Sequence, residues 1–171
     1  IKDKRIDILV NNAGINKIDR FEEISETDFD KILQVNLKAP FLIAQTVVKH
    51  MKEKNWGRVI NIASIFSKLS KAQRASYSAS KFALDGLTAA MSAELSEFNI
   101  LVNTVSPGFI NTELTKEILG AEGISGIKDT IPSKRLGEPE EIAAFVSWLV
   151  SEENNYISGQ NLIIDGGFSR V

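Results

Sequence analysis

The sequence predicts an α/β domain with a parallel β-sheet that is covered by helices on both faces. Strand-like apolar runs alternate with helical patterns along the chain, and connections of this length are typical of parallel strands joined by right-handed crossovers. The first run, Ile6–Val10, is almost continuously apolar, which indicates a strand buried on both faces. With 171 residues, 43% of them hydrophobic, the chain is expected to form a single domain with a substantial core.

A long helix is expected next, from Thr27 to about Lys54, because apolar residues recur there at helical spacing. Asn36 interrupts the apolar face and needs a hydrogen-bond partner if it is buried, so it is either a structural residue or a site residue. Pro40 lacks a backbone donor, and this predicts a bend in the helix near Asn36.

The middle of the chain predicts two strands with a helix between them. Arg58–Ala63 is the first strand, a polar loop occupies 65–74, Ala75–Phe98 is one long helix, and Ile100–Val105 is the second strand. Alanines are frequent in the helix, and small residues permit close helix packing, either inside the domain or at a subunit interface.

The last part of the chain begins with a segment, 112–135, that is expected to be a mobile substrate loop. A short helix is predicted at Glu113–Leu119, and three glycines follow within a few residues, which suits a lid over a site or a plain flexible connector. Pro139 at a first helical position, with acidic neighbours, predicts a further helix. The last strand is expected at Asn161–Asp165.

Composition and charge argue against several kinds of partner. A net charge of −2 offers no basic footprint for nucleic acid. No apolar run approaches the ~20 residues that cross a bilayer, so no membrane association is expected. The absence of cysteine excludes disulfides, thiolate metal sites and cysteine nucleophiles, and it fits a cytoplasmic protein. The single histidine, His50, is expected at the surface, so no metal site is predicted.

Tyr77 and Lys81 are four residues apart and therefore share one face of the predicted helix. A phenol titrates near pH ~10, and an ammonium beside it favours the phenolate, so the pair suggests proton transfer. The spacing alone also fits an exposed helix face that happens to carry both residues. Ser64 follows a strand, as do Asn12 and Pro107–Gly108. Because the carboxyl ends of parallel strands share one edge of a sheet, we expect all these residues to lie near one another.

A series of motifs in this chain resembles the classical short-chain dehydrogenase/reductase family. They are Asn11-Asn-Ala-Gly14, Asn36-Leu-Lys38, Ser64, Tyr77-x-x-x-Lys81, Pro107-Gly108, Arg135–Ala143 and Ser158–Gly167, in this order. The general likeness is to 3-oxoacyl-carrier-protein reductases and to sugar or polyol dehydrogenases. The resemblance implies a three-layer Rossmann-like fold, of which this chain supplies the C-terminal catalytic portion, strands 4 to 7.

The same resemblance implies roles for the candidate site residues. Tyr77 would be the general acid or base, Lys81 would lower the pKa of Tyr77 and bind the nicotinamide ribose, and Ser64 would polarise the substrate carbonyl. Asn36 would hold a water that links Lys81 to bulk solvent. The cofactor, NAD or NADP, would be bound by Asn12, Ala13, Gly14, Tyr77, Lys81, Pro107, Gly108, Ile110 and Thr112. The substrate would be a small carbonyl compound or alcohol, and a homo-oligomer (a dimer or homotetramer) is expected.

The chain departs from the family pattern because no glycine-rich phosphate loop opens a helix here. The nucleotide-binding half of the fold, roughly 80 residues, is therefore expected in a longer parent chain. These 171 residues alone are not expected to turn over a nicotinamide cofactor, and Ile6–Val10 is expected to have an open edge. Two other interpretations remain: a catalytically incomplete fragment that acts as a structural or oligomerisation unit, and a hydrolase that uses Ser64 with Lys81.

Overall fold

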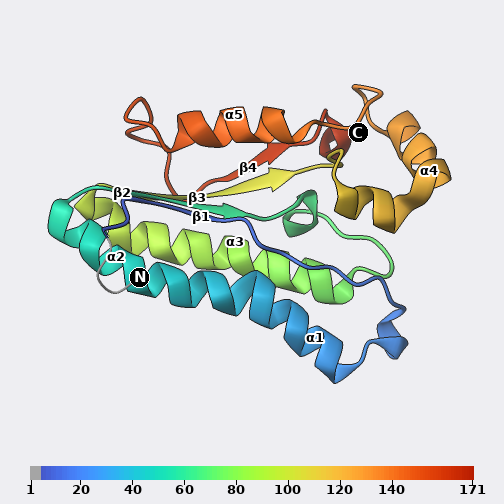
Figure 1. Cartoon of the computed structure of the whole chain (residues 1–171), viewed down its shortest axis with the longest axis horizontal. Coiled ribbons are helices and arrows are strands. Elements are labelled where there is room, and N and C mark those ends of the chain that lie inside the picture. Colours follow the sequence, from blue (N-terminus) through green and yellow to red (C-terminus); the bar gives the residue numbers. More distant parts are fainter. Residues whose placement is uncertain (1–4) are drawn as a thin grey trace.

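The centre of the structure, a computed structural model that describes residues 5–171, is a four-stranded parallel sheet (Figure 1). The strands lie side by side in the order β1 (Ile8–Asn11), β2 (Gly57–Ile62), β3 (Ile100–Pro107) and β4 (Asn161–Ile164). Each neighbouring pair is parallel. The predicted fold class is confirmed, and the strand bounds differ from the predicted ones by a few residues.

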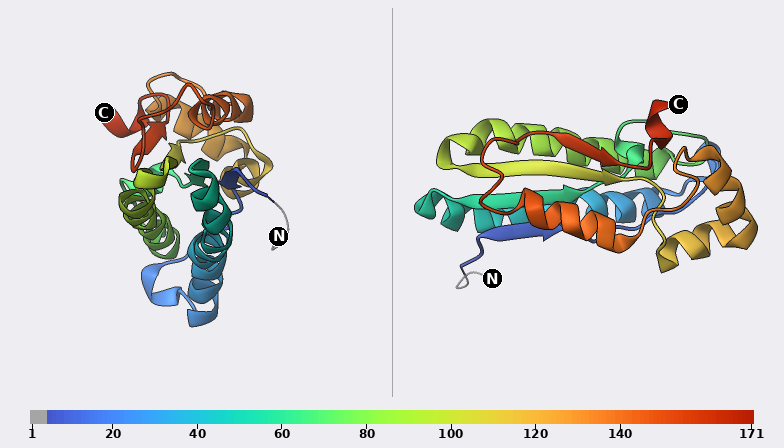
Figure 2. Two further views of the ribbon diagram at one scale, coloured as in Figure 1. Left: turned by 90° about the vertical axis from the view of Figure 1, so that its left-hand side faces the viewer. Right: turned by 90° about the horizontal axis from the view of Figure 1, so that it is seen from above.

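Helices cover both faces of the sheet, as Figures 1 and 2 show. On one face lie α2 (Ala39–Lys54) and α3 (Ala75–Leu95), and on the other lies α5 (Pro139–Leu149). The short α1 (Glu26–Leu33) leads towards α2, and α4 (Glu113–Thr130) lies beyond the carboxyl ends of the strands. Short 3₁₀ helices occupy Phe21–Glu23, Ile65–Ser67, Ser96–Phe98 and Phe168–Arg170.

Each face of the sheet has its own apolar core. On the α2–α3 side, the buried side chains are Val47, Met51, Val59, Leu95, Ile100 and Val102. On the α5 side, they are Ile60, Val105 and Leu149. Because neighbouring residues of a strand point to opposite faces, Val59 and Ile60 of β2 belong to different cores, and the strand is buried along almost its whole length.

The long predicted helix contains an irregular segment at the place where a bend was expected. Between α1 and α2, residues Gln34–Lys38 form a π-helical turn that includes Asn36. Pro40 lies at the start of α2, where its missing N–H is tolerated. The π-helical turn changes the backbone hydrogen bonding locally, and such turns are frequent at functional sites.

The predicted loop at 112–135 is mostly helical, which corrects the expectation of a short helix followed by a flexible stretch. Thr112 caps α4, and the helix continues to Thr130 with a break at Gly120, whose φ is +62°. A left-handed glycine interrupts the helix without ending it, because the chain resumes helical geometry on the other side. Mobility and substrate contact in this segment remain predictions.

Strand β1 lies at an edge of the described sheet and is covered on one face. Leu9 packs against the α2–α3 core, whereas Ile8 and Val10 are 43% and 42% exposed. The expectation that this strand is buried on both faces is therefore wrong within residues 5–171, and the expected open edge is present. Among these residues, no helix is long and apolar enough to cross a membrane.

Candidate active site

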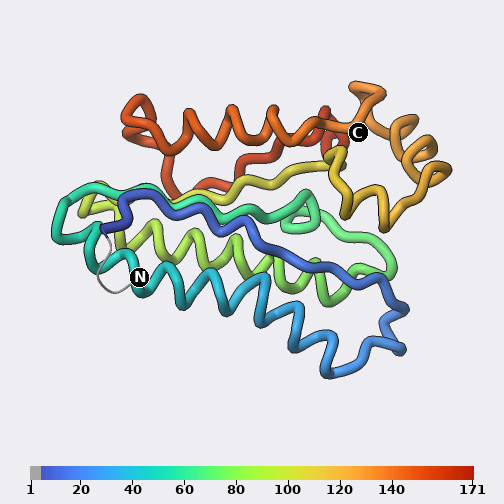
Figure 3. Tube along the Cα trace, in the orientation of Figure 1, coloured from blue at the N-terminus to red at the C-terminus, as the bar shows by residue number. Residues whose placement is uncertain are grey.

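The carboxyl ends of β1, β2 and β3 surround a cavity of about 290 Å³ together with the N-terminal part of α3. The tube in Figure 3 shows the chain leaving β1 and running past this end of the sheet before it returns through α1 and α2. Most of the predicted site residues line the cavity: Asn12, Gly14, Ser64, Tyr77, Lys81, Pro107, Gly108, Ile110 and Thr112. Sequence reasoning therefore located the residues that the fold brings together here.

Two predicted residues do not line the cavity. Ala13 is exposed beside it, and Asn36 is completely buried. The Asn36 amide donates to the Ile15 carbonyl and the Ser80 hydroxyl, and its oxygen accepts from the Ile15 N–H. These bonds connect the segment after β1 to the π-helical turn and to α3. Asn36 therefore has a structural role, which is one of the two roles that its position on an apolar face allowed.

Lys81 is 3% exposed, and its ammonium donates to the carbonyl of Ile62 over 2.9 Å. Burial lowers the pKa of Lys81 from 10.5 to about 8. The ammonium lies 5.7 Å from the centre of the Tyr77 ring. The predicted proximity of the two side chains on α3 is therefore present, with the Lys81 charge directed at the end of β2.

The pKa of Tyr77 is raised in the structure, whereas the resemblance implied that Lys81 lowers it. Burial raises this pKa above its ordinary value, and the effect outweighs the Ser64 hydroxyl and the Arg74 charge, which both lower it. The Ser64 oxygen accepts a hydrogen bond from the Phe66 N–H, which leaves the hydroxyl proton free to donate. Tyr77 is thus a protonated phenol at neutral pH, beside a hydroxyl donor and a buried lysine.

Two glycines lie at close approaches at the cavity. A Cβ on Gly14 would lie 3.3 Å from the Lys81 ammonium and 3.6 Å from the Asn36 amide oxygen. A Cβ on Gly108 would lie 2.7 Å from the Cβ of Asp165, which is closer than carbon atoms can approach. Gly14 therefore keeps space open beside Lys81, and Gly108 allows the end of β3 to pack against the end of β4.

A cluster of polar side chains, Ser67, Ser106 and Asn161, supports the Ser64 turn. The Ser67 hydroxyl donates to the Ser64 carbonyl over 2.7 Å and lies 2.8 Å from the Ser106 hydroxyl. Ser106 donates to the amide oxygen of Asn161 over 2.6 Å, and the Asn161 amide donates back to Ser67 over 3.0 Å. Sequence reasoning missed this cluster, because its members are up to 94 residues apart and no local pattern marks them.

The far wall of the cavity comes from segments that the sequence did not assign to the site. Leu114 and Thr115 of α4, together with Pro139 and Ile142 of α5, line it. Thr112 has two roles. It lines the cavity, and its hydroxyl accepts a hydrogen bond from the Thr115 N–H, which caps α4. In the sequence, Ile142 could be recognised only as part of the apolar stripe of α5. Ile142 lines the site because of where this helix packs in the fold.

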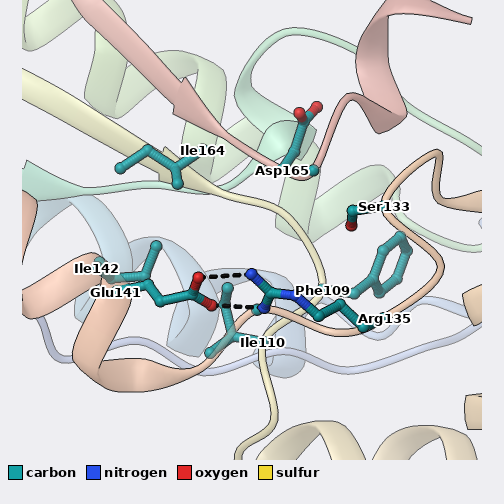
Figure 4. Close-up of a pocket in the computed structure, with 10 residues that line it drawn as sticks. Phe109, Ile110, Ser133, Arg135, Glu141, Ile142, Ile164 and Asp165 are labelled. Carbon is teal, nitrogen blue, oxygen red and sulfur yellow. Dashed lines mark hydrogen bonds and ion pairs between the residues drawn. The ribbon is translucent and has the colours of Figure 1, made fainter.

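A second cavity, of about 240 Å³, adjoins the first and shares Ile110 and Ile142 with it (Figure 4). In this cavity the Arg135 guanidinium donates to both carboxylate oxygens of Glu141, over 2.7 and 2.6 Å. The hydrogen bonds from Arg135 lower the pKa of Glu141 to about 2, and the Glu138 N–H also contributes. The ion pair and the capping box of α5 fix the start of this helix, and with it the wall of the site.

Comparison with known proteins agrees with this geometry. A family profile described as Enoyl-(Acyl carrier protein) reductase matches residues 2–169. The chain is similar to the 3-oxoacyl-(acyl-carrier-protein) reductase FabG of Aquifex aeolicus, with 41% identity over 162 residues that cover 95% of this chain and 65% of that protein. The chain spans about 65% of the length of this reductase and of the acetoacetyl-CoA reductase of Cupriavidus necator, another curated relative that it matches.

Solved structures give the same result. A gluconate 5-dehydrogenase from Burkholderia cenocepacia in complex with NADP and tartrate superposes with a TM-score of 0.95 and 33% identity, covering 99% of this chain and 67% of that one. A mutant 4-hydroxyisoleucine dehydrogenase complexed with NADH and succinate gives a TM-score of 0.94 and 39% identity, covering 99% of this chain and 71% of that one. The fold of this chain is thus shared with part of two dehydrogenases whose structures hold NADP or NADH.

Proposed function

Since the chain belongs to the classical short-chain dehydrogenase/reductase family, we propose that it carries the proton-transfer site of an NAD(P)-dependent oxidoreductase that interconverts a ketone and a secondary alcohol. The observation that supports this most directly is the grouping of Ser64, Tyr77 and Lys81 around one cavity at the carboxyl edge of the sheet. Among relatives, 3-oxoacyl thioesters and sugar or polyol compounds are the named substrate types, and we propose a substrate from these classes.

The residues at the cavity fit the nicotinamide end of such a cofactor. Lys81 uses one of its three ammonium protons on Ile62, which leaves two for ribose hydroxyl groups. Gly14 leaves open the space beside Lys81 that a side chain would fill. We propose that Asn12, Ala13 and Gly14 line the adenosine side and that Pro107, Gly108, Ile110 and Thr112 seat the nicotinamide. When bound, the cofactor supplies or accepts the hydride.

Side chains of this chain carry out the proposed proton transfer. Tyr77 donates its proton to the carbonyl oxygen during reduction, and burial keeps that proton on the phenol at neutral pH. Ser64 donates a hydrogen bond to the same oxygen and stabilises the charge that develops there. The Lys81 ammonium favours the phenolate that Tyr77 becomes after donating its proton.

Asn36 has a further proposed role in proton supply. Its amide oxygen accepts one hydrogen bond, from Ile15, and keeps a second lone pair. This oxygen and the Lys81 ammonium both lie within 4 Å of the point where a Gly14 Cβ would be. A water at the Asn36 oxygen would therefore be near Lys81, and we propose that it links Lys81 to bulk solvent.

A second candidate function is a structural or oligomerisation unit without catalysis. The observation that favours it is an apolar groove of about 390 Å³ between α2 and α3, lined by residues such as Phe41, Leu87 and Met91. We retain the prediction that residues 1–171 alone do not oxidise NADH or NADPH. Oxidation of either by the purified 171-residue chain with a ketone would contradict that prediction.

The test of the proposed reaction compares the two tyrosines of the chain. In the protein that contains this chain, Tyr77→Phe should lower kcat by about 10²-fold or more, because the proton donor is removed. Tyr156→Phe is the matched control, since Tyr156 is 93% exposed, and it should retain activity. The assay is NAD(P)H oxidation with a panel of ketones. Equal rates for Tyr77→Phe and wild type would support the non-catalytic alternative.

A further inference from the structure

Asn161 begins β4, the last strand in the sequence, and its side chain reaches the turn that carries Ser64. Its amide nitrogen donates to the Ser67 hydroxyl over 3.0 Å, and its amide oxygen accepts from the Ser106 hydroxyl over 2.6 Å. Ser67 is 2% exposed and Ser106 is completely buried. One amide group therefore connects the end of β3 to the turn that follows β2.

The direction of these hydrogen bonds follows from the chemistry of the amide group. Its nitrogen only donates and its oxygen only accepts, so Ser67 accepts from Asn161 and Ser106 donates to it. Ser67 has one hydroxyl proton of its own, and the Ser64 carbonyl oxygen, at 2.7 Å, is the nearest of its acceptors. Because the Asn161 nitrogen takes no proton from Ser67, this proton remains available for the Ser64 carbonyl.

The hydrogen bonds of the Ser64 carbonyl fix the residue that carries the proposed substrate donor. This carbonyl accepts from the Ser67 N–H over 2.8 Å as well as from the Ser67 hydroxyl. Ser64 is also the N-cap of the 3₁₀ helix Ile65–Ser67, and its hydroxyl oxygen accepts from the Phe66 N–H over 3.2 Å. The backbone and the hydroxyl oxygen of Ser64 are thus held by the same short turn.

We infer that Asn161 is a positioning residue for the proposed reaction: through Ser67, it holds the Ser64 hydroxyl in place to donate to the carbonyl oxygen of the substrate. A donor stabilises developing charge best when it needs no reorientation during the reaction. Asn161 does not line the cavity, so it acts through the turn and not by contact with the substrate. The inference rests on the proposed ketone–alcohol chemistry and adds to it a residue of β4.

The first variant is Asn161→Asp, which keeps the shape of the side chain and replaces the donating nitrogen by an accepting oxygen. Ser67 then donates to the new carboxylate, and the Ser64 carbonyl loses its bond from the Ser67 hydroxyl. In the protein that contains this chain, kcat with a ketone should fall by about fivefold, which is the order expected for one hydrogen bond between neutral groups. The KM for NADH or NADPH should stay within about twofold of wild type, because the cofactor contacts are unchanged.

A double-mutant cycle with Ser64→Ala tests whether Asn161 acts through the Ser64 hydroxyl. Asn161→Asp should lower kcat by about fivefold when Ser64 is present and by less than about twofold in the Ser64→Ala background, measured at high enzyme concentration. The same loss in both backgrounds would show that Asn161 only supports the fold, and it would overturn the inference. No loss in the presence of Ser64 would also overturn the inference, while the proposed reaction would stand.

Asn154→Asp is the matched control, because Asn154 is 2% exposed and its amide donates to the Leu149 carbonyl. Its backbone carbonyl accepts from Arg58 at the start of β2, whereas Ser64 follows the end of that strand. Asn154→Asp should leave kcat within about twofold of wild type, even where it lowers Tm. A fivefold loss of kcat in this variant would show that destabilisation alone produces the effect, and the inference would be wrong.

Ser67→Ala is the second variant, and it decides the inference should Asn161→Asp fail to fold. It removes the proton that bonds to the Ser64 carbonyl, so it should reproduce the cycle with Ser64→Ala. All rates are measured well below the Tm of each variant, and failure of both variants to fold would indicate a purely structural cluster and overturn the inference. Failure of the proposed function differs from these outcomes: wild type would turn over no ketone, or Ser64→Ala would be as active as wild type, and the inference would fall with it.

Discussion

The buried ammonium of Lys81 should make the stability of this protein depend on pH in a way that one substitution removes. Lys81 is 3% exposed, and burial lowers its pKa from 10.5 to about 8. Between these values the unfolded chain binds a proton that the folded chain does not, so the free energy of unfolding rises with pH across this interval. The difference between 10.5 and about 8 corresponds to about 3 kcal/mol.

The perturbation is Lys81→Met, which keeps an unbranched side chain of nearly the same length and removes the titrating group. The stability of wild type relative to Lys81→Met should be lowest below pH 8 and should increase by about 3 kcal/mol as the pH rises to 10.5. The absolute difference at pH 7 also includes the lost hydrogen bond to Ile62, so the change with pH is the quantity to measure. Urea denaturation at a series of pH values gives it.

Lys49→Met provides the control, because Lys49 is exposed and its substitution leaves the buried ammonium of Lys81 in place. A relative stability of Lys81→Met that changes by less than about 1 kcal/mol across the same interval would refute the reasoning, since Lys81 would then titrate normally in the folded protein. The expected result would show that this lysine is retained at a cost to folding, as is common for groups in active sites.

Two further substitutions test the packing behind the site. Gly108→Ala should destabilise the protein by about 1–3 kcal/mol, because the new Cβ meets Asp165 at 2.7 Å, whereas Gly86→Ala on α3 meets no atom within 4 Å and should not destabilise it. Ser106→Ala should cost about 1–3 kcal/mol, since it leaves the Asn161 amide oxygen without its donor. Both are measured by urea denaturation, and wild-type stability in either variant would show that the contact is unimportant.

The residues that were found from sequence alone are those whose local pattern carries the information. Ser64 and Pro107–Gly108 follow apolar strands, and Tyr77 and Lys81 share a helix face, so strand ends and helical spacing were sufficient to place them. Asn36 was marked by its polarity on an apolar face, although its partners, Ile15 and Ser80, could not be named. The segment after Gly120 was predicted as a flexible stretch because its glycines favour a loop, whereas the structure continues the helix to Thr130.

The sequence by itself determined the order of strands and helices, the parallel sheet and the edge of the sheet at which the site lies, because these follow from periodicity and from turn residues. Tertiary structure alone decided the properties that depend on burial. It raised the pKa of Tyr77, brought Ser67, Ser106 and Asn161 into one cluster, and left two nitrogens of Arg74 buried without a partner within residues 5–171. The physical reason is that desolvation and hydrogen bonding are set by neighbours in space, and these come from parts of the chain that have no relation in sequence.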